Sequence, residues 1–161
     1  MNRHSMLNLI ATAVAWLWIA LLPSNATAQP AADMEGVKAA SKAFYAALSL
    51  NDNGEAISKV WAHTTYVTCV SPSSNSIMVG WGALGKHWVE TKGQFSQMDV
   101  TLSEQDIHVN GNLAWEMGQG IGTLKFKDGR DSKIDFLVTN VYEKVDGRWL
   151  MVSHHVQHKP Q

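Results

Sequence analysis

The sequence predicts an α+β domain in which helices come first and a curled antiparallel sheet follows. Apolar residues recur at helical spacing in the segment 33–50. Three evenly spaced Asx-Gly pairs, each typical of a β-hairpin turn, divide the chain after Phe95: Asn110-Gly111, Asp128-Gly129 and Asp146-Gly147. No proline lies between Pro72 and Pro160, so this stretch lacks the residue that most readily interrupts a central strand.

Residues 1–28 have the layout of an export signal and are set apart from the fold. A basic start is followed by the apolar run 6–22 and by the small-residue end "NATA" at 25–28, which suits cleavage before Gln29. A retained membrane anchor is the alternative, although the run is short for a bilayer span. We therefore expect a periplasmic or secreted protein with no stable membrane insertion after cleavage.

The remaining segment 29–161 is long enough for one domain with a single core. It holds 12 basic and 14 acidic residues, a net charge of −2. Without a basic patch, nucleic acid is not an expected partner. The single cysteine, Cys69, has no partner for an internal disulfide. It is expected to be a buried apolar residue, with a reactive thiol as the alternative.

Helical spacing predicts three helices before the sheet. The first extends from Asp33, a suitable N-cap, to Leu50, and "NDNG" ends it. The second is the short segment "EAISKVW". The third lies within "IMVGWGALGKHWVETKG", after a brief strand, and places Leu84 and Trp88 on its inner side.

One further strand is predicted between the second and third helices. The segment "TTYVTCV" is rich in β-branched and aromatic residues and stops at "SPSSNS". The tryptophans that flank this region, Trp61 and Trp81, are expected in the core, because the helices must seal the open side of the sheet there.

The pairing of the last four strands follows if each Asx-Gly pair is a two-residue hairpin turn. Counting outward from the turns and alternating side chains across each strand gives two faces. The predicted inner face is aromatic and Met-rich with polar residues at its centre: Trp115, Met117, Gln119, Ile121, Phe136, Val138, Asn140, Tyr142, Trp149, Met151, Ser153, His155 and Gln157. The opposite face is thinned by glycines and includes Glu116, Gly118, Gly120, Gly122, His154 and His158.

Three histidines in the segment "SHHVQH" raise the question of a metal site. In the predicted register His155 points inward, whereas His154 and His158 point outward, opposite Thr139 and Asp135. The Cα atoms of His154 and His158 are roughly 13 Å apart at about 3.3 Å per residue, too far for two ligands of one zinc ion. We therefore expect no metal site and no cofactor.

The predicted inner face has the character of a small-molecule pocket. Uncharged polar groups on an apolar face need partners, which are each other, water or a ligand, and a few convergent polar groups in an apolar cavity are typical of a ligand site. The predicted ligand-binding residues are Trp88, Trp115, Gln119, Phe136, Asn140, Tyr142, Ser153 and His155, and His155 is the candidate catalytic residue. A hydrogen-bond network that only fixes strand packing is the alternative.

The order of these segments resembles the nuclear transport factor 2 superfamily, specifically its SnoaL-like branch. The resemblance covers nearly all of 33–158, and its most specific motifs are "GWGAL" at 80–84 and "DGRWLMVSHH" at 146–155. It implies a cone-shaped fold whose curved sheet wraps around the N-terminal helices and encloses a pocket, and a homodimer formed through the sheet. In the similar association domain of calcium/calmodulin-dependent protein kinase, the residues that match Trp149 and His155 point inward.

The resemblance leaves the function open, because the superfamily includes isomerases, cyclases, dehydratases and proteins without catalysis. The ketosteroid isomerase pattern places a tyrosine at Phe44 or Tyr45. It places its aspartate base near Cys69 and its second acid in "FLVTN", where this chain has neither acid. Steroid isomerisation by that machinery is therefore not expected.

Three functions remain as hypotheses. The first is an exported protein that binds a hydrophobic or aromatic small molecule. The second is an isomerase, cyclase or dehydratase with His155 as general base, for which Glu104 or Asp106 would have to supply the carboxylate partner. The third is a non-catalytic dimerisation module.

Overall fold

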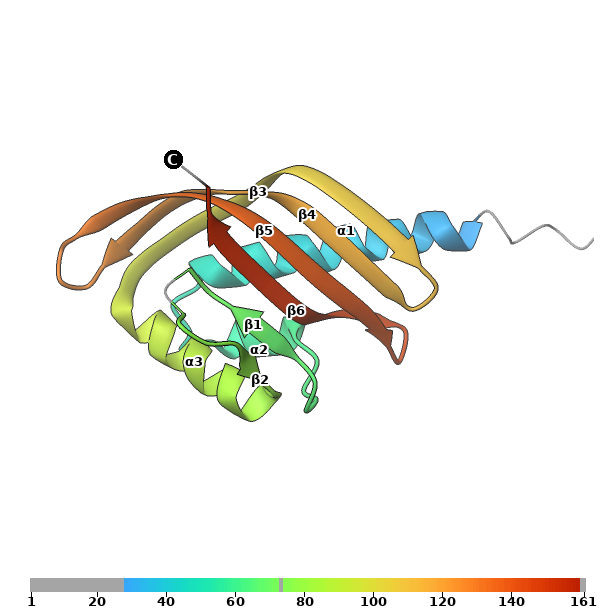
Figure 1. Cartoon of the computed structure of the whole chain (residues 1–161), viewed down its shortest axis with the longest axis horizontal. Coiled ribbons are helices and arrows are strands. Elements are labelled where there is room, and N and C mark those ends of the chain that lie inside the picture. Colours follow the sequence, from blue (N-terminus) through green and yellow to red (C-terminus); the bar gives the residue numbers. More distant parts are fainter. Residues whose placement is uncertain (1–27, 73, 160–161) are drawn as a thin grey trace, which may run out of the picture.

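The structure is a computed structural model that describes residues 28–72 and 74–159 (Figure 1). The predicted export signal therefore lies almost entirely outside the described residues. In the described part, the helices are α1 (Ala28–Ser49), α2 (Glu55–Val60) and α3 (Trp81–Gln94). The strands are β1 (Thr68–Val70), β2 (Met78–Val79), β3 (Phe95–Asn110), β4 (Leu113–Phe126), β5 (Asp131–Val145) and β6 (Arg148–His158). The predicted order of helices and strands is confirmed, and no described helix is long and apolar enough to cross a bilayer.

The six strands form one curved sheet in the order β2-β1-β6-β5-β4-β3. The long strands β3 to β6 arch over α1, while α2, α3, β1 and β2 lie on the same side and close it (Figure 1). All neighbours are antiparallel except β1 and β6, which run parallel. This is the α+β cone predicted from the sequence, with its concave face toward the helices.

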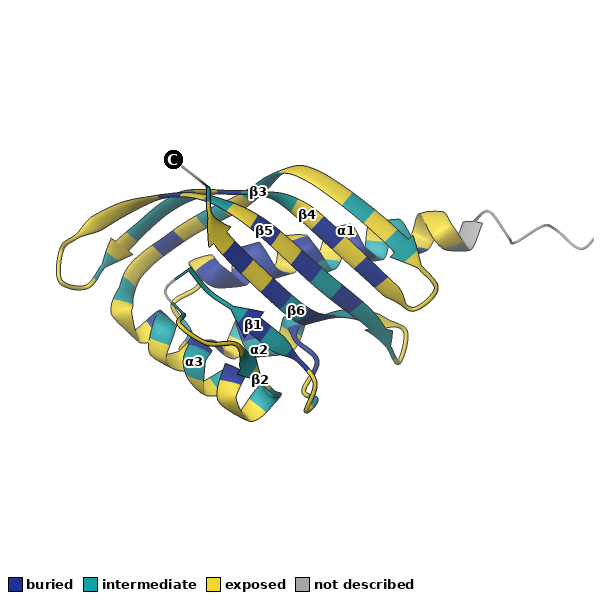
Figure 2. Ribbon diagram, viewed as in Figure 1, coloured by how far each residue is buried: buried dark blue, intermediate teal, exposed yellow. Residues whose placement is uncertain are grey.

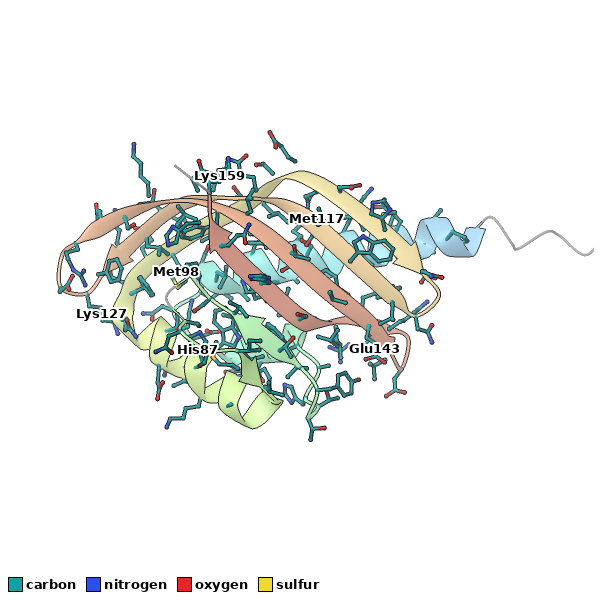
Figure 3. The ribbon with its side chains drawn as sticks, in the orientation of Figure 1. His87, Met98, Met117, Lys127, Glu143 and Lys159 are labelled. Carbon is teal, nitrogen blue, oxygen red and sulfur yellow. The ribbon has the colours of Figure 1, made fainter. Side chains whose placement is uncertain are left out.

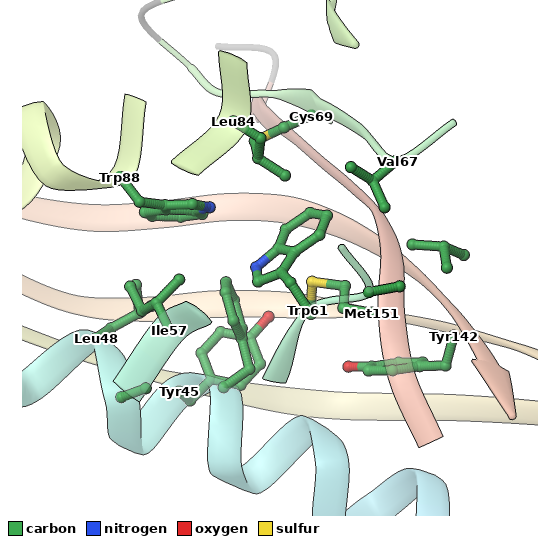
Figure 4. Close-up of a cluster of buried hydrophobic side chains, with 14 of the residues drawn as sticks. Tyr45, Leu48, Ile57, Trp61, Val67, Cys69, Leu84, Trp88, Tyr142 and Met151 are labelled. Atoms are coloured by element: carbon green, nitrogen blue, oxygen red, sulfur yellow. The ribbon is translucent and has the colours of Figure 1, made fainter. Parts of the chain in front are cut away.

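Buried residues lie between the helices and the concave face (Figure 2). Several of their side chains are aromatic, including Tyr45, Trp61, Trp88 and Tyr142 (Figure 4). The ring of Phe44 on α1 packs edge-on against Trp61 and Trp88, at centroid distances of 6.4 and 5.8 Å. Trp61 is buried as predicted, whereas Trp81 is half-buried and stacks on His63. Burial raises the pKa of the Cys69 thiol to about 12, so Cys69 is an inert core residue rather than a nucleophile.

Two of the three predicted hairpins have two-residue turns. Val145 pairs with Arg148 across Asp146-Gly147, and both turn residues have positive φ angles, 49° and 77°, as a type I′ turn requires. The first turn lies at Gly111-Asn112, one residue later than predicted. That displacement shifts the pairing by two residues, so from Asp106 to Asn110 each β3 side chain stays on the same face as its predicted β4 partner, and a register shift between Ser103 and Asp106 ends this relation.

The middle hairpin differs from the prediction, and the difference reverses β4. The Phe126 N–H donates to the Arg130 carbonyl at 2.8 Å, which leaves a three-residue loop at 127–129. Gly129 takes the left-handed conformation, with φ of 89°, that closes such a loop. The predicted two-residue turn is therefore wrong. One extra loop residue moves β4 by one position along β5 and exchanges its two faces.

A β-bulge in β6 reverses the end of that strand as well. Tyr142 pairs with Met151, but the next residue, Val141, pairs with Ser153, so Val152 is the extra residue and both Met151 and Val152 are buried. The bulge lies where the Ala62 N–H donates to the Met151 carbonyl at 3.0 Å, just before the parallel pairing with β1 begins. Beyond the bulge every side chain of β6 points to the face opposite to the predicted one.

These two shifts redistribute the residues between the faces of the sheet. The concave face carries Glu116, Gly118, Gly120, Asn140, Tyr142 and His154, and the convex face carries Trp115, Met117, Gln119, Ile121, Leu137 and His155. The predicted inner face is correct for β5 and the start of β6 but wrong for β4 and the end of β6.

The glycine row lies on the concave side, where strands β3 and β4 bend closely together. A Cβ atom on Gly118 would lie 2.8 Å from the Ser103 carbonyl oxygen, and one on Gly122 would lie 1.8 Å from that of Asp99. These glycines therefore permit the curvature of the sheet rather than flatten its outer surface.

Candidate active site

A cavity of about 390 Å³ lies between the concave face and α3, within the size range of small-molecule sites. Its walls are mainly apolar and come from α3 and all four long strands; they include Phe95, Met98, Leu124, Phe136, Val138 and Val156. Gly120 has no side chain to fill the space between them. Figure 3 shows His87 on α3 and Met98 on β3, both of which line this cavity.

The cavity has a buried end and an open end. Tyr45 from α1 and His154 from β6 line it and are both only 7% exposed. Glu90 on α3 and His158 at the end of β6 also line it but are exposed. A molecule in the cavity would therefore meet Tyr45 and His154 at its inner end and Glu90 and His158 near the entrance.

A buried carboxylate lies behind the inner end. Glu116 on β4 is fully buried and accepts three hydrogen bonds, from Gln105 Nε2 at 2.7 Å, Asn140 Nδ2 at 2.8 Å and the Tyr142 hydroxyl at 2.9 Å. Among residues 28–72 and 74–159, no basic side chain forms an ion pair with Glu116. The three donors therefore replace the water that such a carboxylate would otherwise need.

His154 is connected to this carboxylate through Asn140. Its Nδ1 lies 2.7 Å from Asn140 Oδ1, and because a carboxamide oxygen can only accept, the Nδ1–H donates. A neutral imidazole with its proton on Nδ1 has a lone pair on Nε2. Within the described chain nothing hydrogen-bonds to His154 Nε2, so this lone pair is available to a molecule in the cavity.

The surroundings of His154 keep it neutral. Burial lowers its pKa to about 3, and the nearby His155 and His87 act in the same direction. The Phe44 ring lies 5.0 Å away and that of Trp88 lies 6.3 Å away, which accounts for the loss of hydration. At neutral pH, Nε2 is therefore unprotonated and can accept a proton or a hydrogen bond.

Tyr45 offers a donor and shares Asn140 with His154 as a hydrogen-bond partner. Its hydroxyl oxygen accepts from Asn140 Nδ2 at 3.3 Å, and the described residues provide no acceptor for its own proton. Burial, with the Glu116 charge adding to it, raises the pKa of Tyr45 above its usual value, so the phenol keeps that proton. The inner end of the cavity thus combines one base and one neutral hydrogen-bond donor.

The predicted site residues divide between the two faces. Trp88 and Phe136 line the cavity, and Asn140 and Tyr142 are buried behind it, so their predicted inward orientation is confirmed. Trp115, Gln119 and His155 lie on the convex face, and their predicted inward orientation is wrong, because the longer loop and the bulge reverse their strands. Ser153 is half-buried and accepts a hydrogen bond from the Thr68 hydroxyl; it does not line the cavity.

The predicted partners of the other histidines are also corrected. His154 lies opposite Asn140 instead of Thr139, and His158 lies opposite Phe136 instead of Asp135. Asp135 pairs with Lys159 at 3.0 Å. The candidate carboxylate partners of His155 do not reach it: Asp106 contacts His108, and Glu104 is exposed in an irregular part of β3.

Sequence reasoning missed Tyr45, Glu116 and His154 as site residues, although part of the signal was present. The predicted register placed Glu116 and His154 on the same face, which is correct. The error was in the orientation of β4 and of the end of β6 relative to β5. Among the residues that the structure describes, no three His, Cys, Asp or Glu side chains are placed so that they could hold a metal ion.

Comparisons with known proteins agree with this architecture. The SnoaL-like domain family matches residues 37–156. A proposed dehydratase of the NTF2-like family from Streptomyces avermitilis has a similar structure, with a TM-score of 0.73 and 21% identity over 82% of this chain and 99% of that chain. A proposed calcium/calmodulin-dependent protein kinase type II association domain from Thiobacillus denitrificans has a TM-score of 0.64 and 22% identity, covering 76% of this chain and 94% of that one.

One curated protein also shows sequence similarity. The F-box protein SKIP8 of Arabidopsis thaliana is 27% identical over 101 residues, which is 63% of this chain and 40% of that protein. The match therefore spans less than half of the curated relative. The structural similarities establish an NTF2-like fold.

Proposed function

The chain belongs to the SnoaL-like domain family, and from that premise we propose that its cavity is an active site in which His154 removes a proton from a neutral, ring-containing small molecule. The observation that carries this proposal is the unpaired Nε2 of a neutral, buried histidine on the wall of an apolar cavity. The similarity to a proposed dehydratase of the same fold supports the reaction class.

The chemistry that fits is proton abstraction next to a carbonyl group. His154 Nε2 takes the proton from carbon, the electron pair moves into the carbonyl to form an enolate, and the Tyr45 hydroxyl donates a hydrogen bond to its oxygen. The protonated His154 then returns the proton to another carbon, which is an isomerisation, or to a departing β-hydroxyl group, which leaves as water. Neither sequence of steps needs a cofactor.

The cavity favours an uncharged substrate. No lysine or arginine is present among its described lining residues, and the acidic residue, Glu90, lies at the entrance. A phosphate or carboxylate bound inside would lose its hydration without gaining a basic partner, and this desolvation costs at least several kcal/mol of binding free energy. The aromatic walls formed by Trp88, Phe95 and Phe136 suit a hydrophobic or aromatic ring system.

The experiment is deuterium exchange with model ketones. We expect the protein to accelerate α-proton exchange of 2-tetralone or 1-indanone in D₂O, measured by mass spectrometry, with saturation behaviour. Val138→Trp, which fills the cavity, should abolish the exchange while the circular dichroism spectrum stays unchanged. Absence of protein-catalysed exchange across a panel of such ketones that do bind, as judged by quenching of tryptophan fluorescence, would contradict catalysis.

Binding without exchange would favour the second candidate, a protein that only binds a hydrophobic or aromatic molecule. The specific observation in its favour is that the polar groups at the inner end are largely satisfied by one another. In that case the ketones should raise the melting temperature of the protein, and they should incorporate no deuterium beyond the uncatalysed exchange.

The exposed apolar residues of the convex face support a homodimer formed through this face. Trp115, Met117, Ile121 and Leu137 lie on this face, and each is at least 38% exposed; exposed apolar surface of this kind is typical of interaction sites. The similarity to an association domain is compatible with such an assembly. Light scattering after size exclusion should give twice the chain mass; a monomer at micromolar concentration would contradict the proposal.

Export remains a proposal that rests on the segment 1–28 alone. Fusion of this segment to a reporter enzyme that is active only outside the cytoplasm tests it. We expect reporter activity and a mature N-terminus at Gln29.

A further inference from the structure

We propose that Glu116 is a positioning residue that determines, through the amide of Asn140, which ring nitrogen of His154 carries the proton. This inference rests on the proposed role of His154 as a base. It adds a cause for the tautomer that this role requires.

The side-chain amide of Asn140 has two possible orientations with opposite consequences. In the observed one, Nδ2 donates to Glu116 and Oδ1 accepts from His154 Nδ1. If the amide were reversed, Nδ2 would face Nδ1, which would have to accept, and the ring proton would move to Nε2. The base at the cavity wall would then be lost.

The Glu116 carboxylate selects the first orientation. The Asn140 amide lies 2.8 Å from Glu116 Oε2, and this oxygen also accepts from the Tyr142 hydroxyl, so it presents an acceptor to Asn140. The reversed amide would bring two acceptor oxygens to that distance in a fully buried site where water does not separate them. Glu116 therefore fixes the orientation of the Asn140 amide, and that orientation fixes which nitrogen of His154 carries the proton.

Glu116 can orient the Asn140 amide because two further hydrogen bonds hold its carboxylate in place. Gln105 Nε2 and the Tyr142 hydroxyl donate to its oxygens, and Gln105 also reaches the Ser41 hydroxyl at 3.3 Å. The donors come from β3, β5 and, through Ser41, α1. The tautomer of His154 is thus tied to the assembly of three elements around β4.

Two substitutions separate the polarity of Glu116 from its charge. In Glu116→Gln, the new amide can keep its oxygen toward Asn140 while Gln105 reverses to accept from the new NH₂ group, so the polarity is retained and the charge is lost. In Glu116→Met, both are lost and Asn140 is free to reverse. Glu143→Met is the matched control, because Glu143 on β5 also pairs with a tyrosine, Tyr66, but outside the cavity.

The measurement is the ¹⁵N NMR spectrum of the His154 ring in the full folded chain. We expect a protonated Nδ1 and an unprotonated Nε2 in the wild type, in Glu116→Gln and in Glu143→Met, and a mixture of tautomers in Glu116→Met. Ketone exchange should fall about 10-fold in Glu116→Gln, which loses only the charge that stabilises the imidazolium, and about 100-fold in Glu116→Met, losses comparable to those for removing the partner of an oriented histidine.

The outcomes overturn the inference independently of the proposed reaction. A protonated Nε2 in the wild-type protein contradicts it whether or not any variant folds. An unchanged tautomer in folded Glu116→Met also contradicts it. Absence of ketone exchange together with the expected tautomers would count against the proposed function but leave Glu116 as the group that orients His154.

Discussion

His154 and His155 are neighbours in the chain and occupy opposite sides of one sheet. His154 is 7% exposed, forms a hydrogen bond with the buried side-chain amide of Asn140 and lines the cavity. His155 is exposed, and its strand neighbour on β5 is the exposed Thr139. The same side chain is therefore buried in one position and solvated in the next, which shows that the environment of each histidine is set by the face it occupies and not by the histidine cluster.

The two faces differ in the same way as a whole. The concave face has buried polar groups whose hydrogen bonds are provided by one another, and glycines where strands approach closely. The convex face has large apolar side chains in water, such as Trp115 and Met117, at 40% and 50% exposure. The concave face therefore lines a cavity, and the convex face leaves apolar side chains exposed.

The largest expected difference is in turnover. His154→Asn can keep the hydrogen bond to Asn140 but has no base, so we expect ketone exchange to fall by about 10²- to 10⁴-fold, the usual contribution of a general base. His155→Asn, the matched control, should change the rate less than about twofold, because that residue does not line the cavity. Equal losses in the two variants, measured under saturating ketone, would contradict the assignment of the faces.

The next largest effect is on stability and concerns the curvature of the concave face. Gly122→Ala would place a methyl group 1.8 Å from the Asp99 carbonyl oxygen, so β3 and β4 must separate. We expect a loss of about 3 kcal/mol in the free energy of unfolding, at the upper end for overpacking. Gly93→Ala in α3 has nothing within 4 Å and should gain about 0.5 kcal/mol. Urea denaturation measures both, and an unperturbed Gly122→Ala would show that the bend does not need this glycine.

A smaller effect is the dependence of stability on pH. The pKa of His154 is about 3 in the folded state and about 6.5 in the unfolded state, so between these values the unfolded chain binds more protons. The contribution of His154 is complete above pH 6.5 and declines as the pH falls toward 3, by at most about 1.4 kcal/mol per unit.

Denaturation at pH 7 and pH 5 checks this linkage in the same pair of variants. His154→Asn should lose that part of the pH dependence, and His155→Asn should retain it. A wild-type slope that survives in His154→Asn would assign the linkage to other groups.

The smallest effect on the monomer is expected on the convex face. Met117→Lys places a charge in the apolar surface, so it should dissociate the proposed dimer while changing the stability of the monomer by less than about 0.5 kcal/mol. Thr65→Lys, at an exposed position in the loop before β1, adds the same charge elsewhere and should leave the mass unchanged. Sedimentation velocity distinguishes the two. An intact dimer in Met117→Lys would place the interface on another surface.

The elements of this fold could be predicted because their signals are local. Helical spacing located α1 to α3, and glycine in the turns located all three hairpins to within about one residue, because positive φ angles favour glycine wherever they occur. The burial of Trp61, Trp88 and Cys69 also followed from local pattern. The three residues that define the inner end of the cavity did not, because they are far apart in sequence, at positions 45, 116 and 154, and meet only on the assembled sheet.

The sequence by itself determined the class, the order of the elements and the pairing partners of the last four strands. The tertiary structure decided which side of each strand faces the helices. Side chains alternate with a period of two, so one extra loop residue before β5 was enough to exchange Trp115 for Glu116 on the concave face. One bulged residue, Val152, was enough to exchange His155 for His154. The bulge lies where β6 pairs with Ala62 and with β1, and such pairing between segments far apart in the sequence is specified by no local pattern in the chain.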